Sequence, residues 1–402
     1  MKKVKISPSS LCGTVSAPPS KSAAHRALIC SFLSGGGSVE PIIDSNDMRA
    51  TVGVIEALKN NGKVLNCIES GSTLRFMIPI AAALGKSVIF TGEGRLPNRP
   101  VGEYLDLLPK NGVSVISNGG LPLEISGTLK NGTYEVSGDV SSQYITGLLL
   151  ALATLDGDSA VVLKTELKSK PYVDMTVKIM ADYGVKVFET DFGYLIHGGQ
   201  KFKTQNYTVE GDWSQAAFFL VAGAVSGDVT VNGLDMNSTQ GDKKIIDILK
   251  AFGADVTVSE NSVRVKKSSL SANNIDATDI PDLVPIISVL AANSSGTSVI
   301  SGVERLRYKE SDRIKSIREN LELLGIKTKE TKNSIEITGG KMNGACLRGF
   351  NDHRIVMAFS IAGLVCSGEI SIDDYESINK SYPSFFEDYK SLGGVADVIG
   401  NR

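Results

Sequence analysis

Six segments of the chain share one pattern, in which a polar cluster leads directly into an apolar helix rich in small residues. They read PSKSAAHRALICSFL near Lys21, SGSTLRFMIPIAAALG near Ser72, SSQYITGLLLALATL near Ser142, GDWSQAAFFLVAGAV near Asp212, IPDLVPIISVLAA near Asp282 and NDHRIVMAFSIAGLV near His353. After a first interval of about fifty residues, the spacing stays at about seventy. The pattern indicates a repeated structural unit.

A second pattern alternates with the first: an amphipathic helix that ends at glycine and is followed by a strand of alternating polarity. The glycines placed as helix C-caps are Gly62, Gly112, Gly184, Gly253, Gly325 and Gly393. Six units with two helices and several strands each predict an α+β fold built from α/β repeats. Halving six gives two domains of three units, with a hinge near 210–212. A solenoid is the alternative, but helices that are apolar all round favour burial inside compact globules.

The buried helices carry a functional implication. If the units pack in parallel, the helix N-termini of each domain point to one end, where free N–H groups and positive dipole ends favour anions. Two such domains facing each other would create a cleft of positive potential. The sequence therefore predicts an anion site without requiring a high net charge.

Composition narrows the class of protein. The 402 residues carry a net charge of −2, which argues against a uniformly basic nucleic-acid binder. The five cysteines are scattered without a CxxC pair, which predicts reduced thiols in a cytoplasmic protein and no zinc site. The N-terminal stretch has no apolar signal-peptide core, and no segment approaches the ~20 apolar residues of a membrane span. The GxxxxGK[ST], HExxH and GxSxG motifs are absent.

Two of the helix starts carry cations where the helix dipole disfavours them. In PPSKSAAHRAL, Lys21 and Arg26 follow a serine cap, and in NDHRI the cap Asp352 precedes His353 and Arg354. A cation at a helix N-terminus costs about 0.3–1 kcal/mol. Plain capped helices would explain each segment singly, but the repeated misplacement favours anion binding.

Other helix starts offer polar groups for phosphate or hydroxyl ligands, although a simple N-cap explains each one as well. The groups are Gly71, Ser72 and Arg75; Ser141, Ser142 and Gln143; and Ser169 with Lys170 before Pro171. Arg99, held between Asn98 and Pro100, and Lys380, just before an amphipathic helix, are further candidate cations that could equally lie on the surface.

One carboxylate and one dense charge cluster point towards chemistry. Asp282 stands at the head of an apolar helix, either as its N-cap or as an ionised base among cations. In YKESDRI, a helix would place Lys309 and Arg313 on one face, which is repulsive without an anion. The alternative is a solvated face on which Glu310 and Asp312 pair with the cations.

Together these segments resemble the 5-enolpyruvylshikimate-3-phosphate synthase family. The resemblance runs nearly end to end, through PPSKSAAHRAL, SGSTLRF, LPNRPVGEYL, VSSQ, SKPYVD, EGDWSQA, IPDL, YKESDRI, NDHRI and KSYPSFFEDY in family order. It implies two domains of three βαβαββ units, residues 21–210 for the shikimate-phosphate half and residues 1–20 plus 211–402 for the other, with the active site between them. It also implies transfer of the enolpyruvyl group of phosphoenolpyruvate to the 5-hydroxyl of shikimate 3-phosphate, on the route to chorismate and the aromatic amino acids.

The resemblance assigns the site residues. For shikimate 3-phosphate they are Ser22 and Arg26 on the carboxylate side, Ser141, Ser142, Ser169 and Lys309 at the phosphate, and Gln143 and Asp282 at the ring hydroxyls, together with Lys21. For phosphoenolpyruvate they are Lys21, Gly71, Arg99 and Lys380 at the phosphate, and Arg313 and Arg354 at the carboxylate. Asp282 is expected to accept the hydroxyl proton, with Glu310 and Lys21 as candidates for proton transfer at carbon in an addition–elimination mechanism.

Three positions depart from the commoner family pattern: Glu69 replaces an asparagine, Phe76 a proline, and Arg305 an asparagine in the shikimate-phosphate region. These changes affect expectations about substrate affinity and glyphosate response, not the reaction.

Three other functions remain as rivals. A UDP-N-acetylglucosamine enolpyruvyltransferase would typically carry a reactive cysteine on the loop that here reads LPNRP, and no cysteine lies between Cys67 and Cys346. An RNA-end-processing cyclase would typically use a histidine nucleophile, which the context of His353 does not suit. A non-catalytic anion binder would gain nothing from Asp282 and Glu310 among cations. We further expect a monomer without metal or organic cofactor, acting on small molecules rather than on nucleic acid or membrane.

Overall fold

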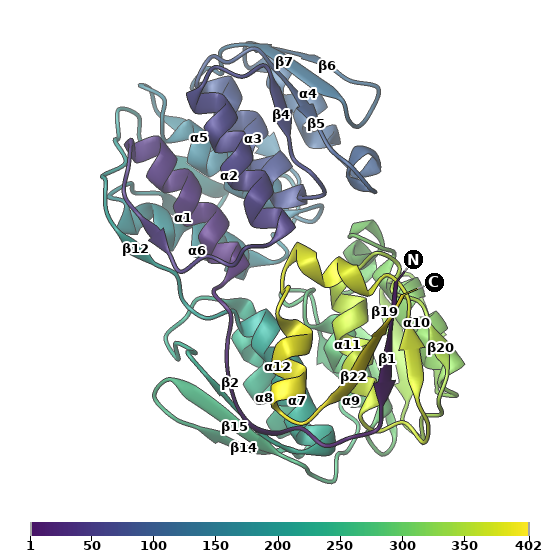
Figure 1. Ribbon diagram of the computed structural model, residues 1–402. Helices are drawn as coiled ribbons and strands as arrows, with labels where there is room; N and C mark the ends of the chain where they lie inside the picture. Colours follow the sequence, from purple (N-terminus) through teal and green to yellow (C-terminus); the bar gives the residue numbers. More distant parts are fainter. Residues whose placement is uncertain (1, 401–402) are drawn as a thin grey trace. The chain divides into compact units, whose positions relative to one another are not determined.

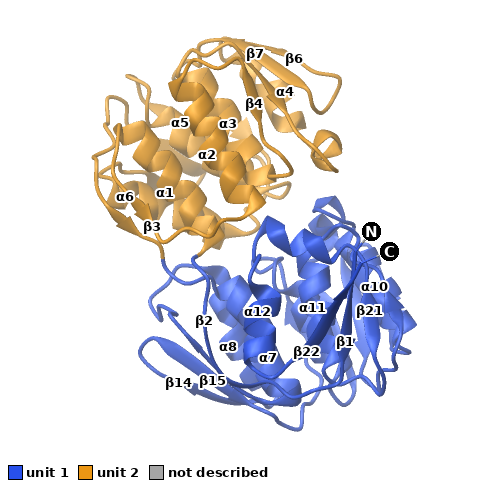
Figure 2. Ribbon diagram, in the orientation of Figure 1, with its two compact units in different colours: residues 1–19, 210–402 blue, residues 20–209 orange. Residues whose placement is uncertain are grey.

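The computed structural model describes residues 2–400 and divides into two compact units. Unit 1 comprises residues 1–19 and 210–402, and unit 2 comprises residues 20–209 (Figure 2). The chain passes from one unit to the other after Pro19 and again after Val209. The family resemblance implies crossings near Ser20 and Glu210.

Unit 2 is built on six helices and three sheets (Figure 1). Its helices are α1 (Lys21–Ser34), α2 (Asn46–Lys59), α3 (Gly71–Ala83), α4 (Gly102–Lys110), α5 (Ser142–Leu152) and α6 (Lys170–Asp182), with the 3-10 turn η1 (Leu96–Asn98). Its strands are β3 (Val39–Glu40), β4 (Val64–Asn66), β5 (Val88–Thr91), β6 (Val113–Ile116), β7 (Leu123–Gly127), β8 (Thr133–Val136), β9 (Ser159–Leu163), β10 (Phe188–Thr190), β11 (Gly193–Ile196) and β12 (Tyr207–Thr208).

Unit 1 has three four-stranded sheets around its helices. The helices are α7 (Trp213–Ser226), α8 (Ile245–Ala251), α9 (Val284–Ala292), α10 (Arg313–Leu323), α11 (His353–Gly363) and α12 (Phe385–Ser391), with the 3-10 turns η2 (Gly241–Lys244), η3 (Glu304–Tyr308) and η4 (Tyr375–Lys380). The strands are β1 (Lys3–Ser7), β2 (Cys12–Ser16), β13 (Asp228–Asn232), β14 (Asp255–Val258), β15 (Ser262–Lys266), β16 (Ile275–Asp276), β17 (Thr297–Ser301), β18 (Lys327–Glu330), β19 (Ser334–Thr338), β20 (Cys346–Leu347), β21 (Ile370–Ile372) and β22 (Val395–Ile399).

Five sheets repeat one design, with one parallel strand pair followed by two antiparallel pairs. The sheet β4-β5-β7-β6 is an example: β4 runs parallel to β5, and β7 runs antiparallel to both β5 and β6. The other four are β10-β11-β9-β8, β14-β15-β13-β2, β16-β17-β19-β18 and β20-β21-β1-β22. The repeated α+β class predicted from the chain is therefore confirmed.

One of the three repeats within residues 20–209 departs from this design. Where a further four-stranded sheet is expected, β3 and β12 form a parallel pair of two residues each. Pro41 directly follows β3, and proline has no N–H to continue a strand ladder. One of the three repeats in this half therefore has a two-stranded sheet in place of a four-stranded one.

The apolar helices are buried, as their sequences predict. Every residue of α7, α9 and α11 is buried, and α3 and α5 are nearly so. In Figure 1 the strands β14 and β15 lie on the outside of unit 1, with α7 and α8 inward of them. The sheets therefore cover a helical interior, which is why these helices need no polar face.

The glycines that end the amphipathic helices behave as predicted with one exception. Five of the six adopt positive φ angles of 81° to 95° just beyond the helix: Gly112, Gly184, Gly253, Gly325 and Gly393. At the end of α2, Asn61 takes the left-handed conformation instead, with φ of 53°, and Gly62 does not. Asparagine tolerates this region better than most residues, so the expected role of Gly62 is wrong.

Candidate active site

The helix starts of unit 1 lie next to one another. Arg354, at the start of α11, donates from Nη2 to Ser214 Oγ at the start of α7 (2.9 Å). Its Nη1 donates to the backbone carbonyl of Asp282, two residues before α9 (3.3 Å). These bonds join the first residues of three buried helices, so their positive ends gather in one place, as the sequence predicts.

Asp282 does not cap the helix that follows it. The helix α9 begins at Val284, Leu283 occupies the N-cap position, and no side chain caps it. Proline is suited to a helical first turn, and Pro285 at this position fits the observed start. The carboxylate of Asp282 is thereby left for other partners.

Those partners are three cations. Asp282 Oδ1 lies 2.9 Å from Arg313 Nη1 and 3.6 Å from Lys309 Nζ, and Oδ2 lies 3.1 Å from Arg354 Nη2. Arg313 also contacts Glu310 Oε2 from Nη2 (2.8 Å). Arg313 also pairs with a third carboxylate, that of Asp352. These contacts join six side chains, which we call the unit 1 charge cluster. Its members are Asp282, Lys309, Glu310, Arg313, Asp352 and Arg354.

Asp352 is the buried anchor of this cluster. Its side chain is fully buried and accepts from Arg313 Nε (2.9 Å), Ser311 Oγ (3.0 Å) and the backbone N–H of Arg354 (3.0 Å). The last bond caps α11. A charge-assisted cap that also holds an arginine fixes the guanidinium direction. The sequence indicates the cap but gives no sign of the arginine, which is 39 residues earlier.

The cluster controls the ionisation of its members. Burial alone would raise the pKa of Asp282, but the charges of Arg354, Lys309 and Arg313 outweigh burial and hold that pKa well below its ordinary value. Burial and the neighbouring Arg313 lower the pKa of Lys309, although Asp282 opposes them. The carboxylates of Asp352, Glu310 and Asp282 overcome burial and raise the pKa of Arg313. Asp282 is therefore ionised at neutral pH.

The expected helix through Lys309 and Arg313 is wrong. Lys309 follows the turn η3, and α10 begins only at Arg313, with Asp312 as its N-cap. The Asp312 side chain accepts from the backbone N–H of Lys315 (3.1 Å), which explains why the helix starts there. The two cations meet through Asp282 rather than on one helical face. Lys380, at the end of η4, is buried and donates to the carbonyl of Asn351 (2.7 Å).

In unit 2, the cations of α1 have partners within the protein. Ser20 caps the helix, and Lys21, its first residue, pairs with Asp47 Oδ2 of α2 (2.6 Å). Arg26 lies in the second turn, is buried, and donates to Thr176 Oγ1 (2.7 Å) and to the carbonyl of Ser22 (2.8 Å), among other acceptors. Burial lowers the pKa of Arg26 to about 10, which leaves it charged at neutral pH. The aspartate explains how a cation is tolerated at this helix start.

The first turn of α3 collects further predicted site residues. Ser70, not Ser72, caps the helix, because its side chain accepts from the backbone N–H of Thr73. Gly71 faces two guanidinium groups: a Cβ there would lie 2.7 Å from Arg99 Nη1 and 2.9 Å from Arg75 Nη1. A larger residue at this position would therefore require the two guanidinium groups to move.

Arg75, which the sequence offers either as a ligand-binding group or as a solvated arginine, is buried. It donates to Gln143 Oε1 (2.8 Å) from Nη1 and to the carbonyl of Pro100 from Nη2 (2.8 Å). Gln143 Nε2 in turn donates to Ser72 Oγ (2.9 Å). Arg75 thus ties the first turn of α5 to the turn that carries Arg99.

Of the three serines predicted to bind the phosphate of shikimate 3-phosphate, two lie at the start of α5 and one at the start of α6. Ser141 caps α5 by accepting from the N–H of Gln143, and Ser142 is the first residue of the helix. Ser169 precedes α6 with φ of 59° and makes no side-chain cap. A non-glycine residue in this region costs on the order of 1–3 kcal/mol and persists where its surroundings enforce it.

The three departures from the family pattern each have a local setting. Glu69 lies against Gly94, where a Cβ would approach Glu69 Oε2 to 2.2 Å. The ring of Phe76 lies under the Arg26 guanidinium, 5.1 Å from ring centroid to Cζ. Arg305 donates to the carbonyl of Thr278 (2.8 Å), on the loop that leads to Asp282.

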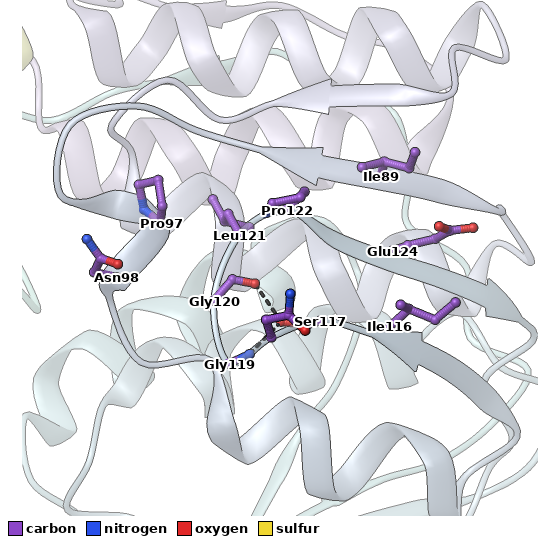
Figure 3. A pocket seen from close by; sticks show the side chains of 11 residues that line it. Ile89, Pro97, Asn98, Ile116, Ser117, Gly119, Gly120, Leu121, Pro122 and Glu124 are labelled. Atoms are coloured by element: carbon purple, nitrogen blue, oxygen red, sulfur yellow. Dashed lines mark hydrogen bonds between the residues drawn. The ribbon is translucent and has the colours of Figure 1, made fainter.

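An open pocket of about 460 Å³ adjoins the turn before Arg99 (Figure 3). Pro97 and Asn98 line one side of it, and Figure 3 shows Ser117 bonded to the carbonyl of Gly120 on the other. The backbone N–H of Leu121 donates to the carbonyl of Pro97 (3.0 Å). The hairpin that contains Gly120 therefore packs against the turn that carries Arg99 and holds it by this hydrogen bond.

No helix within residues 2–400 combines the length and the apolar character needed to cross a bilayer. Within the same range, no three side chains of histidine, cysteine, aspartate or glutamate are grouped as metal ligands.

Comparison with known proteins agrees with this geometry. Residues 59–389 match the family described as EPSP synthase (3-phosphoshikimate 1-carboxyvinyltransferase). The 3-phosphoshikimate 1-carboxyvinyltransferase of Clostridium novyi strain NT is 42% identical, and the alignment covers 99% of both chains. That of Clostridium acetobutylicum is 41% identical, with 97% of both chains covered.

Solved structures give the same result. The EPSP synthase of Acinetobacter baumannii superposes with a TM-score of 0.82 over the whole of both chains, at 26% identity. The enolpyruvyl transferase NikO of Streptomyces tendae shares the fold, with a TM-score of 0.80 at 18% identity over 100% of this chain and 99% of that one. The chain belongs to the EPSP synthase (3-phosphoshikimate 1-carboxyvinyltransferase) family.

Proposed function

We propose that the protein transfers the enolpyruvyl group of phosphoenolpyruvate to the 5-hydroxyl of shikimate 3-phosphate and releases phosphate. The observation that carries the proposal is Asp282, an ionised carboxylate that forms ion pairs with Arg313, Arg354 and Lys309. A binding protein for anions has no use for a carboxylate in this position. A transferase that must remove a hydroxyl proton beside anionic substrates does.

Charge balance explains how the site serves two anionic substrates. The unit 1 charge cluster has three cations (Lys309, Arg313, Arg354) and three carboxylates (Asp282, Glu310, Asp352), so its formal charge is 3 − 3 = 0. Substrate anions would compete with the protein carboxylates for the arginines. Planar guanidinium groups suit this exchange, because they bind either carboxylate or phosphate in a bidentate manner.

The residue roles follow the resemblance and the local geometry. We assign Ser22 and Arg26 to the carboxylate side of shikimate 3-phosphate, Ser141, Ser142, Ser169 and Lys309 to its phosphate, Gln143 and Asp282 to its hydroxyls, Lys21, Gly71, Arg99 and Lys380 to the phosphate of phosphoenolpyruvate, and Arg313 and Arg354 to its carboxylate. Lys21 also contributes to the binding of shikimate 3-phosphate.

The chemistry is an addition followed by an elimination. In the addition, Asp282 accepts the 5-hydroxyl proton, the 5-oxygen bonds to C2 of phosphoenolpyruvate, and an acid protonates C3 to give a methyl group. In the elimination, that methyl group loses a proton and the bond from C2 to the phosphate oxygen breaks. Glu310, held by Arg313 at 2.8 Å, and Lys21, held by Asp47 at 2.6 Å, are our candidates for proton transfer at carbon.

Substrate binding would itself adjust the base. In the ligand-free protein the surrounding cations lower the pKa of Asp282, which makes its carboxylate a weak base. When Arg313 and Arg354 bind a substrate carboxylate, that anion partly cancels their positive charge at Asp282. The cations then lower the pKa of Asp282 less, so this pKa rises. Proton abstraction is thereby favoured once both substrates are bound.

The test is phosphate release by the purified protein with phosphoenolpyruvate alone, with added shikimate 3-phosphate, and with added UDP-N-acetylglucosamine. We expect release only with shikimate 3-phosphate. Release with UDP-N-acetylglucosamine would establish the rival transferase, and no release with either acceptor would leave an anion-binding protein. We also propose a cytoplasmic location, which the five free thiols support, and a monomeric state, which light scattering of the purified protein would check.

A further inference from the structure

A chain of buried hydrogen bonds runs through three helices of unit 2. His25 Nδ1 of α1 lies 2.7 Å from Thr51 Oγ1 of α2, which lies 2.7 Å from Thr73 Oγ1 of α3. Thr73 Oγ1 donates to Ser70 Oγ (2.8 Å), the cap of α3. All four side chains are at most 1% exposed. Neither the cap of α3 nor the assigned site residues account for this chain.

The donors and acceptors along these hydrogen bonds follow one order. A hydroxyl has a single proton, and Thr73 uses its proton on Ser70, so it accepts from Thr51. Thr51 has then used its own proton and accepts from His25, which must carry its hydrogen on Nδ1. The reverse direction would place the hydrogen on Nε2, which has no hydrogen-bond partner among residues 2–400. A buried N–H without an acceptor is rarer than an unsatisfied acceptor.

His25 is held as a neutral donor by what surrounds it. Burial, and then the charges of Lys21 and Arg26, lower the pKa of His25 well below its ordinary value. The ring of Phe76 packs edge to face against the imidazole, with 6.4 Å between centroids, and also lies under the Arg26 guanidinium. Phe76 therefore contacts both the imidazole and the nearby guanidinium.

The series of hydrogen bonds ends at the first turn of α3, which contacts other site residues. Ser70 caps α3 by accepting from the N–H of Thr73 (3.2 Å). The next two residues are Gly71, which faces the Arg99 guanidinium, and Ser72, which accepts from Gln143. A change at Ser70 would therefore reach both of these contacts.

We propose that His25, Thr51 and Thr73 are positioning residues that lock Ser70, and with it the first turn of α3, in the geometry that binds phosphoenolpyruvate. The inference deepens the proposed function and rests on it, because Gly71 and Arg99 are assigned to the phosphate of that substrate. The three residues act through Ser70 and touch no substrate. The relay links the helix start that carries Lys21 to the one that carries Gly71.

The tautomer of His25 is the first test. The chain has only three histidines, so ¹⁵N spectra of histidine-labelled protein can be assigned with single substitutions of His197 and His353. We expect the Nδ1–H tautomer of His25 at neutral pH in the intact protein. A shift towards the Nε2–H form is expected in Thr51→Val, which removes the acceptor and keeps the shape. An Nε2–H tautomer in the unmodified protein would overturn the proposal.

Kinetics with matched variants is the second test. Thr51→Val should raise KM for phosphoenolpyruvate by roughly 2- to 30-fold, the range expected for loss of a helix cap, while Thr51→Ser should restore it. Thr73→Val should act similarly, and the double valine variant should cost little more than either single one, because both break the same relay. Ser288→Ala, which removes a buried hydroxyl that donates to the Val284 carbonyl of its own helix, is the control.

The outcomes separate the two proposals. Equal KM values for the valine and serine variants of Thr51, or effects of Thr51→Val and Thr73→Val that simply add, would refute the relay. Circular dichroism and thermal unfolding identify a variant that has failed to fold, and Thr73→Val then provides the comparison. If the unmodified protein released no phosphate with shikimate 3-phosphate, the proposed function would fail, whereas the tautomer of His25 would still report on the hydrogen-bond chain.

Discussion

The substitution Asp282→Asn separates a catalytic carboxylate from a structural one. Asparagine keeps the shape of the side chain and one oxygen that can accept from Arg313 or Arg354, but it cannot take up the hydroxyl proton. Loss of a general base lowers turnover by about 10²- to 10⁴-fold. We expect kcat for phosphate release to fall within that range.

The same substitution should leave substrate binding intact or strengthen it. In the native cluster Asp282 attracts Arg313 at 2.9 Å and Arg354 at 3.1 Å. At an effective dielectric constant of about 20, each contact provides about 5 kcal/mol of Coulomb attraction before desolvation is subtracted. The substitution changes the formal charge of the cluster from 0 to +1, so that attraction becomes available to substrate anions.

The assay compares turnover with binding in the same protein. Phosphate release gives kcat, and calorimetric titration with shikimate 3-phosphate gives Kd for the intact protein and the variant. Asp228→Asn is the matched control, because Asp228 makes a similar two-point contact with Arg264 but on the exposed surface of the same unit. A kcat within tenfold of the native value would refute the role of Asp282 as base. A Kd that weakens in proportion to kcat would show that the residue is needed for binding alone.

Three further predictions rest on the same contacts. Arg313→Leu leaves the fully buried Asp352 carboxylate without its arginine and should lower the free energy of unfolding by about 3–5 kcal/mol in urea titrations, whereas a loss under 1 kcal/mol would contradict the structure. Because the pKa of folded Asp282 lies below its unfolded value of about 3.9, the stability it contributes is complete above that pH and declines as the pH falls towards the folded value. The difference in unfolding free energy between the native protein and Asp282→Asn should therefore shrink below about pH 4, by at most about 1.4 kcal/mol per pH unit, and a constant difference would refute the shift. Gly120→Ala would put a Cβ 1.9 Å from the Pro97 carbonyl oxygen and should raise KM for phosphoenolpyruvate through the Arg99 turn, whereas Gly53→Ala, in open space on α2, should leave KM unchanged and add about 0.5–1 kcal/mol of stability.

The helix starts show how far local sequence reaches. Ser20 and Asp352 cap their helices as the sequence predicts, because capping depends on residues within one turn of each other. The same reasoning fails where two local signals compete. The helix expected through Lys309 starts instead at Arg313, because Asp312 is an effective N-cap. Likewise, α9 starts at Val284, followed by Pro285, and not at Asp282.

The sequence by itself determined the repeated α+β architecture, the burial of its apolar helices and the gathering of candidate site residues at helix starts. Periodicity, caps and glycine stops operate over a few residues, so they can be read along the chain. Only the tertiary structure decided which groups meet: Asp47 with Lys21, Asp282 with Arg354 and His25 with Thr51. These partners are separated by 26, 72 and 26 residues. No local rule connects such distant positions, because the packing of separate helices brings them together.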